Sequence, residues 1–273
     1  MKRIVLCADD YGISPGVSKA IRELIATGRL NATSVMTIFP GFAEEAKALA
    51  ETPSPAPAQI GLHLTLSGGF APLTAPPLAT RDGKLPAINR LLSPFARFRI
   101  DRKALDLEIA AQLDAFISAF GRLPDFVDGH QHVHLMPGIR NCFLKEVARI
   151  APNAWVRQCG PARKRMLISA DNKTRFIGLL SLIFARRAKR KGIKTNPAFS
   201  GAYEFGSTSK FSDLFPRFLS ELPDGGVMMC HPGHADAVLR ERDTLVERRD
   251  EEYAFLASEQ FNDAMKAAGA TLA

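Results

Sequence analysis

The sequence predicts an α/β protein built on a parallel β-sheet, either open or closed into a barrel. Strand-like and helix-like segments alternate along the 273 residues, and repeated strand–helix units place successive strands parallel to one another. Acidic residues and histidines also fall at the ends of the expected strands, the edge at which parallel sheets carry their sites. The hydrophobic content of 46% is enough for one large core, so we expect a single domain over residues 1–273.

The first expected strand covers residues 4–9, and its apolar run ends on two carboxylates. Ser14 then fits an N-cap followed by proline at the first helical position, and Gly28 fits the end of that helix. The segments expected next are a strand over 34–39, a helix over 42–50 and a strand over 59–66.

Residues 67–100 are rich in glycine and proline, so we expect a long connection that forms a loop or lid near the site. Asp101 is expected to cap a long helix that ends at Gly121. The remaining expected elements are a strand into a turn over 125–130, a helix over 137–150, a strand over 154–159, a helix over 211–222, a strand over 227–230 and a closing helix over 251–268.

The net charge of +8 comes from one segment of the chain. Residues 161–194 contain 11 lysines and arginines and one acidic residue, whereas the other residues carry 25 basic and 27 acidic side chains. This basic helical segment therefore indicates a local partner surface rather than a uniformly basic protein. Residues 176–185 at its centre are apolar but too short to span a bilayer.

The cellular compartment is indicated by the apolar stretches and the cysteines. No apolar stretch reaches the ~18 residues of a membrane span. The apolar run at the N-terminus stops at Asp9, too early for a signal peptide, so we expect a cytoplasmic protein. The four cysteines form no Cys-x-x-Cys pair and are expected to be free thiols.

Asp9 and Asp10 are the first candidates for chemistry. They follow a buried strand directly, and burying two adjacent carboxylates is costly unless a cation or shared protons compensate. A metal site or an acid/base site explains the pair most simply, although such pairs also occur as loop caps.

Five of the six histidines lie in three further motifs. His63 lies within the strand expected over 59–66, and His231 follows the strand expected over 227–230. Taken alone, the first fits a buried core histidine and the second a strand-end histidine bonded to the backbone. Both nevertheless fall at strand ends, where Asp9 and Asp10 also lie.

Residues 128–134 contain an aspartate followed by three alternating histidines. Alternate residues of an extended strand point to the same side, so we expect the three imidazoles and Asp128 to converge. A solvated turn before Pro137 is the ordinary alternative. One aspartate and two histidines are enough to hold a divalent cation and to leave positions open for water and substrate.

Four motifs together resemble those of the YdjC-like carbohydrate deacetylases, a family that includes chitooligosaccharide deacetylase. They occupy residues 8–14, 61–64, 128–134 and 229–232 in the family's order, and the likeness runs from residue 3 to about residue 265. The basic segment is most similar to the hopanoid-biosynthesis-associated HpnK branch. The resemblance implies a distorted (β/α) barrel of the glycoside hydrolase-deacetylase type, with one divalent cation, Mg²⁺ or Zn²⁺, at the strand ends.

The resemblance also implies roles for individual residues. Asp9 would be the general base, and His231 the general acid or a stabiliser of the transition state. Gln131 stands where the family often has a histidine; it is expected to point away from its neighbour and to leave the metal site unaffected. The implied metal ligands are Asp10, His63 and His130.

The implied reaction is metal-dependent removal of the N-acetyl group from an N-acetylhexosamine-containing carbohydrate or glycolipid, with N-acetylglucosaminyl hopanoid as one candidate. A metal-dependent phosphoesterase on a similar barrel is an alternative, but it would need basic side chains near the ligands, and the sequence shows none closer to the motifs than Arg140. A nucleic-acid-binding protein is a second alternative; the basic segment lacks a recognition motif, so no nucleic acid is expected.

A helix resting on an anionic membrane surface is a further reading of the basic segment, against that of an ordinary barrel helix with a solvated basic end. A peripheral contact through residues 163–194, at the inner face of the membrane, would suit a glycolipid substrate.

Overall fold

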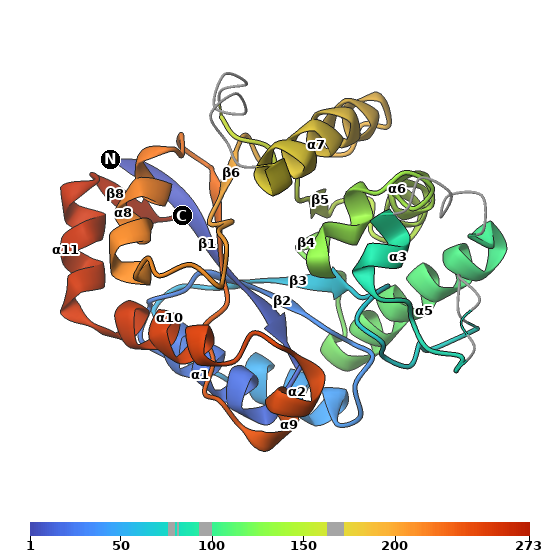
Figure 1. The fold of residues 1–273 in the computed structure, drawn as a ribbon, viewed down its shortest axis with the longest axis horizontal. Helices are drawn as coiled ribbons and strands as arrows, with labels where there is room; N and C mark the ends of the chain where they lie inside the picture. The colour runs from blue at the N-terminus through green and yellow to red at the C-terminus, as the bar shows by residue number, and fades with distance from the viewer. Residues whose placement is uncertain (76–79, 81, 93–99, 163–171) are drawn as a thin grey trace.

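The computed structural model describes residues 1–75, 80, 82–92, 100–162 and 172–273. Figure 1 shows a curled sheet with most of the helices packed around its outside. The described part of the expected loop over 67–100 contains the short helix α3 (Ile88–Leu92), and the described part of the basic segment contains α7 (Asn172–Arg190).

In the described part of the chain the sheet has eight strands, and every pairing between them is parallel. Their order is β5-β4-β3-β2-β1-β7-β6, and β8 pairs with β1 beside this path. The strands are β1 (Lys2–Tyr11), β2 (Ala32–Val35), β3 (Gln59–Leu64), β4 (Phe126–Gly129), β5 (Trp155–Val156), β6 (Phe199–Ser200), β7 (Val227–Cys230) and β8 (Ala270–Leu272).

The two ends of this strand order meet along an irregular seam. Val156 N donates to Lys194 O at 2.9 Å, and Phe199 N donates to Gly160 O at 3.0 Å. Between these two backbone bonds the side chain of Asn196 replaces a backbone acceptor: Gln158 N donates to Asn196 Oδ1 at 2.8 Å. The sheet therefore closes into a barrel with one distorted join, and the predicted distorted (β/α) barrel is confirmed.

Helices follow the strands and cover the outside of the barrel, where their apolar faces meet the core. They are α1 (Pro15–Ala26), α2 (Phe42–Ala50), α5 (Arg102–Phe120), α6 (Arg140–Ile150), α8 (Phe211–Ser220), α9 (Ala237–Arg242), α10 (Glu247–Ala257) and α11 (Glu259–Ala267). The expected caps are present: Ser14 Oγ accepts from Val17 N at 3.3 Å, Asp101 Oδ1 accepts from Lys103 N at 2.9 Å, and Gly121 ends its helix with φ of 64°.

Several expected boundaries were wrong. β2 begins at Ala32 rather than at residue 34, because Ala32 already pairs with Cys7 of β1. The closing helix expected over 251–268 is two helices, because Ser258 adopts an extended backbone between α10 and α11. The strand expected over 154–159 is reduced to β5. The short elements β6, α9 and β8 had no periodic signal in the sequence.

Candidate metal centre and active site

Both carboxylates at the end of β1 face the same cavity. Adjacent side chains of a regular strand point to opposite faces. Here the pairing with β2 shifts register between Ala8 and Tyr11, and Asp10 has a left-handed backbone with φ of 68°. This bulge re-aims the Asp10 side chain toward the cavity that Asp9 also lines. Each carboxylate is only 2% exposed, so both need compensating charges.

Asp10, His63 and His130 form a cluster that can hold a cation. One ligand atom of each residue lies within 4.8 Å of the other two. Asp10 Oδ1 is 2.9 Å from Nδ1 of His130 and 3.2 Å from Nε2 of His63. A carboxylate with two imidazoles is a common donor set for a divalent metal. The residues therefore fit the cation that the sequence predicts, with β1, β3 and the turn after β4 each supplying one donor.

A carboxylate behind His63 fixes the orientation of its ring. His63 Nδ1 lies 2.6 Å from Asp128 Oδ1 and 3.0 Å from Ser34 Oγ, which leaves Nε2 to face Asp10. Metal-binding histidines are held in this way. Burial alone would lower the pKa of His63, but the carboxylates of Asp128 and Asp9 outweigh burial and raise the pKa to about 10. A bound cation would take the place of that proton.

Arg157 is the positive partner of Asp9. Its two terminal nitrogens lie 2.6 and 2.7 Å from the two oxygens of Asp9, and Nη2 lies 2.6 Å from Asp128 Oδ2. Burial opposes ionisation of Asp9, yet the guanidinium holds its pKa well below the usual range. Asp9 is therefore a fixed, ionised carboxylate at the edge of the candidate metal cluster.

A second group of possible ligands is already neutralised by the same guanidinium. Atoms of Cys7, Asp9 and Asp128 also lie within 4.8 Å of one another. Arg157 Nη2 approaches Cys7 Sγ at 2.9 Å as well as both carboxylates. Because a buried cation already sits among these atoms, they are a structural support and not a second metal site.

Arg249 of α10 supports the other carboxylate. Its Nη2 lies 2.6 Å from Asp10 Oδ2 and 2.7 Å from Asp243 Oδ2, and the side chain is fully buried. Burial would raise the pKa of Asp10, but Arg249 and His130 hold it well below its usual range. One oxygen of Asp10 thus faces the two imidazoles while the other is held by Arg249.

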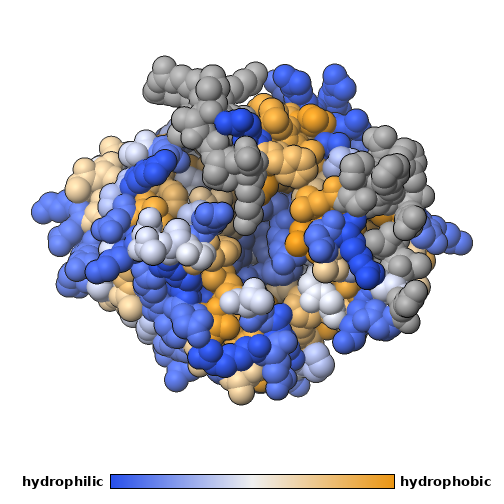
Figure 2. Space-filling model, viewed as in Figure 1, coloured by the Kyte–Doolittle hydropathy of each residue, from blue (hydrophilic) through white to orange (hydrophobic). Residues whose placement is uncertain are grey.

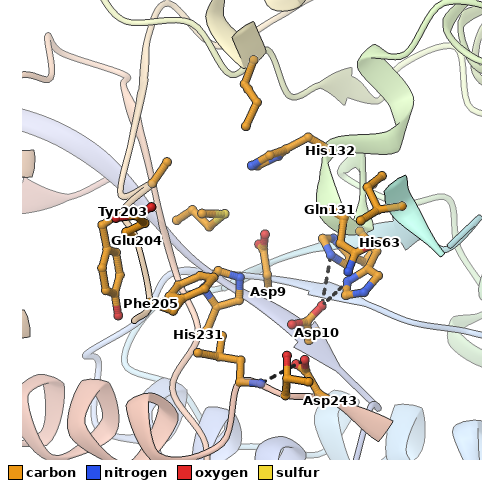
Figure 3. A pocket seen from close by; sticks show the side chains of 18 of the residues that line it. Asp9, Asp10, His63, Gln131, His132, Tyr203, Glu204, Phe205, His231 and Asp243 are labelled. Atoms are coloured by element: carbon orange, nitrogen blue, oxygen red, sulfur yellow. Dashed lines mark hydrogen bonds and ion pairs between the residues drawn. The ribbon is translucent and has the colours of Figure 1, made fainter. Parts of the chain in front are cut away.

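His231 lies across the pocket from His63, with Asp9 between them (Figure 3). Its ring packs edge-on against Phe205, with centroids 5.3 Å apart. Burial lowers the pKa of His231 to about 4 despite the nearby carboxylate of Asp10, so the imidazole is neutral at pH 7. The backbone N–H of His231 donates to Glu252 Oε2 at 2.5 Å, which fixes the loop that carries the ring.

The prediction that residues 128–134 are extended and bring three imidazoles together was wrong. Residues His130–Leu135 form a 3-10 turn, and Gln131 and His132 have left-handed backbones with φ of 52° and 57°. This turn sends the side chains in different directions. His132 lines the pocket, whereas His134 points into the core, where its Nε2 lies 2.9 Å from Arg157 O.

Two further expectations about this region were wrong. Gln131 was expected to point away from His130, but both residues line the same pocket, and Ser67 Oγ donates to Gln131 Oε1 at 2.8 Å. Basic side chains were expected to be no nearer than Arg140, but the fold brings Arg157 and Arg249 against Asp9 and Asp10. Both guanidinium groups are bound by carboxylates and buried, so they are not available to hold a phosphate group in the pocket.

The pocket is a cavity of about 390 Å³ with a polar floor and a partly apolar wall. The carboxylates and histidines line its depth, while Ile88, Leu92, Met136 and Phe176 contribute to the wall. Figure 2 shows the hollow near the centre of the view, with apolar side chains along part of its border. A ligand with one polar end and one apolar face would match this lining.

Arg157 and Arg249 are the supporting residues that the sequence did not reveal. A lone arginine inside the expected strand over 154–159 was a usable signal for Arg157, because a charge in a buried strand requires a partner. Arg249 stands in a helix rich in both signs of charge, and nothing in that pattern distinguishes it.

The fold and the site together define a class: a distorted parallel α/β barrel with a carboxylate–imidazole cluster at the strand ends. Residues 3–267 match the model of the YdjC-like protein family, so the chain belongs to that family, as the motifs predict.

Relatives of the chain include two carbohydrate deacetylases. The protein from Geobacillus stearothermophilus is 27% identical over 92% of this chain and 88% of its own length. The one from Mus musculus is 28% identical over 85% of this chain and 78% of its own length. A chitooligosaccharide deacetylase from Citrobacter koseri is 27% identical over 88% of this chain and 86% of its own length. The crystal structure of a candidate cellobiose-phosphate cleavage protein from Enterococcus faecalis has the same fold, with a TM-score of 0.77. The two sequences are 20% identical, and the match covers 100% of this chain and 97% of the other.

Proposed function

We propose that this protein is a metal-dependent carbohydrate deacetylase that hydrolyses the acetamide of an N-acetylhexosamine unit. The observation that carries the proposal is the cluster of Asp10, His63 and His130, whose ligand atoms lie within 4.8 Å of one another, beside the ionised Asp9 and opposite His231. The names of the relatives, carbohydrate deacetylase and chitooligosaccharide deacetylase, support the same reaction.

Asp10, His63 and His130 would hold one Mg²⁺ or Zn²⁺ ion. When bound, such an ion polarises the acetyl carbonyl and lowers the pKa of a water molecule. Two imidazoles favour zinc, whereas the carboxylate suits either metal. Asp128 and Arg249 keep the donors in place, because they bond to the atoms of His63 and Asp10 that face away from the cluster.

Asp9 is the proposed general base. Arg157 keeps this carboxylate ionised and fixes both oxygens, so it can accept the proton that the attacking water loses. The leaving amine needs one proton, and the proton that Asp9 takes from the water can be transferred to the leaving nitrogen.

His231 is the proposed acid or stabilising group. It lies beside Asp9, across the pocket from His63 (Figure 3), and burial keeps its ring neutral in the free protein. A neutral imidazole has one N–H to donate. This N–H can donate a hydrogen bond to the developing oxyanion, or the ring can relay the proton from Asp9 to the leaving nitrogen.

A glycolipid is the proposed form of the substrate, with N-acetylglucosaminyl hopanoid as the specific candidate. The apolar wall that Ile88, Leu92 and Phe176 contribute to the pocket supports a substrate whose sugar reaches the polar floor while an apolar aglycone lies against the wall. The same wall continues onto the surface of α7.

We propose a peripheral contact of α7 with an anionic membrane at the inner membrane face. Phe176, Leu179 and Ile183 are 45%, 52% and 40% exposed, and their spacing places them on one side of the helix. Figure 2 shows apolar side chains at the upper edge of the molecule, over α7. Exposed basic residues follow this stripe: Arg186, Arg187, Lys189, Arg190 and Lys191. No described helix is long and apolar enough to cross a membrane.

Metal analysis combined with acetate release tests the proposed function. The purified protein should bind about one divalent ion and release acetate from chitobiose, from N-acetylglucosaminyl hopanoid or from both. Chelation should abolish acetate release, and His63→Ala or His130→Ala should lower metal content together with activity. Full metal content and activity in both variants would contradict the assignment of the ligands.

The matched control is His234→Ala. His234 lies outside the cluster and bonds to Glu23 at 2.7 Å, so its loss should leave both readouts unchanged.

A further inference from the structure

Arg140, the first residue of α6, is a buried cation that forms no ion pair with any of the described residues. Its side chain is 9% exposed, and its Nη1 is buried without a hydrogen-bond partner among the described residues. A buried guanidinium nitrogen left unpaired is costly. The other basic residues of α6 differ: Lys145 lies 2.6 Å from Asp106, and Arg149 lies 2.6 Å from Glu146.

A second guanidinium lies beside Arg140 instead of a carboxylate. Arg187 of α7 donates from Nη1 to Asn141 Oδ1 at 2.8 Å, which brings its charge to the start of α6. Burial, together with the charge of Arg187, lowers the pKa of Arg140. Two positive groups of this kind repel each other unless an anion lies between or beside them.

The backbone at this point also favours an anion. The N-terminus of a helix carries a partial positive charge and unpaired N–H groups. The N-cap of the 11-residue helix α6 is Ile139, and no side chain caps it. The N–H of Arg140 bonds to Met136 O at 3.1 Å, so the N–H groups left at this end among the described residues are those of Asn141 and Cys142. Helix side chains tilt toward the N-terminus, so the Arg140 side chain lies at the same end. A cation at this position is unfavourable without a bound anion.

We infer that Arg140, Arg187 and the N-terminus of α6 bind a phosphate group. Arginine forks and helix N-termini are both suited to phosphate oxygens. The group can come from a free phosphate or from the headgroup of a phospholipid, because α7, which supplies Arg187, also carries the apolar stripe. This site lies outside the catalytic pocket and does not depend on the proposed deacetylation.

Calorimetric titration with inorganic phosphate tests the site. The wild-type protein should bind phosphate, and Arg140→Gln and Arg187→Gln should each weaken binding about tenfold or more, the loss expected for a charge-assisted hydrogen bond. Arg149→Gln is the matched control, because Arg149 is on the same helix and already paired; its affinity should equal that of the wild type. Arg187 is exposed, so its variant tests the site even where the Arg140 variant fails to fold.

Vesicles distinguish the two sources of phosphate. Phosphatidylcholine vesicles with and without phosphatidic acid should be compared for binding of the same variants. Retention on phosphatidic acid that Arg187→Gln abolishes and that free phosphate competes away identifies a lipid headgroup. Phosphate binding without such retention identifies a soluble phosphate. Equal phosphate affinity in the wild type and both variants, or no binding of either probe, would overturn the inference.

Discussion

Asp9 and Asp10 are adjacent in the chain but belong to two different charge networks. Arg157 fixes Asp9, and Arg249 fixes Asp10. In the proposed mechanism this separation suits Asp10 to the role of metal ligand and Asp9 to that of base. The left-handed backbone of Asp10 makes the arrangement possible, because it brings both side chains to one cavity.

Replacing Asp9 with asparagine tests its role as a base. Asp9→Asn keeps the shape of the side chain and removes its basicity. We expect the rate of acetate release to fall roughly 10²–10⁴-fold, the usual scale for a lost general base. Metal content should remain that of the wild type, because Asp10, His63 and His130 are untouched. A rate close to that of the wild type would refute the role.

Most of the pocket residues could be predicted from the sequence by their residue types and their positions at the ends of expected strands. Asp9, Asp10, His63, His130 and His231 all line the pocket, because parallel strands place their carboxyl ends at one edge. The side-chain directions after β4 were not predictable, since they depend on two left-handed residues that are not glycine. Arg157 and Arg249 become site residues only through contacts between distant parts of the chain.

At the scale of elements, α10 connects both sides of the pocket. Arg249 reaches Asp10, and one turn later Glu252 accepts hydrogen bonds from His231 N and from Tyr203 Oη, the latter at 2.7 Å. Glu252 is fully buried. Burial raises its pKa to about 7, even though its hydrogen bonds and Arg249 oppose the increase.

This raised pKa predicts a loss of stability as the pH rises. Below the ordinary pKa of glutamate, Glu252 is protonated in both the folded and the unfolded state. Between that value and about 7, the folded state holds a proton that the unfolded state has lost, so the free energy of unfolding falls with pH. Above about 7 the accumulated loss is about 3 kcal/mol.

Glu252→Gln should remove this contribution, since glutamine does not titrate. Relative to the wild type, the variant should gain stability between pH 5 and pH 8, as measured by denaturant unfolding. Asp250→Asn at an exposed position of α10 is the control. A wild-type-minus-variant difference that stays constant with pH would contradict the prediction.

The proposed membrane contact of α7 is tested by flotation with vesicles of phosphatidylglycerol. Each basic residue near an anionic surface contributes about 1 kcal/mol, so binding should weaken with salt. Replacing Arg186, Arg187, Lys189, Arg190 and Lys191 with glutamine should reduce binding at least tenfold and leave activity on a soluble sugar intact.

Phosphatidylcholine vesicles serve as the control for that experiment. If the unmodified protein stays free of anionic vesicles at low salt, then α7 is only a helix of the barrel.

At the scale of the whole molecule, the alternation of strands and helices was sufficient to predict a parallel sheet, and the resemblance to the YdjC-like family favoured the barrel over an open sheet. Short strands were harder to predict: the ten residues of β1 gave a clear signal, whereas β6 with two residues and β8 with three were missed. Such short strands form because their neighbours present unpaired backbone groups, a condition that exists only once the sheet is assembled.

The barrel should open first at its seam between β5 and β6. There Val156 and Phe199 make isolated backbone bonds, whereas β1 lies between continuous partners. We therefore expect the amide protons of Val156 and Phe199 to exchange for deuterium faster than those of β1 and β7. A bound cation would join β1, β3 and the turn after β4, so it should slow exchange there and leave the seam unprotected. Uniform protection around the barrel would contradict this view of how it opens.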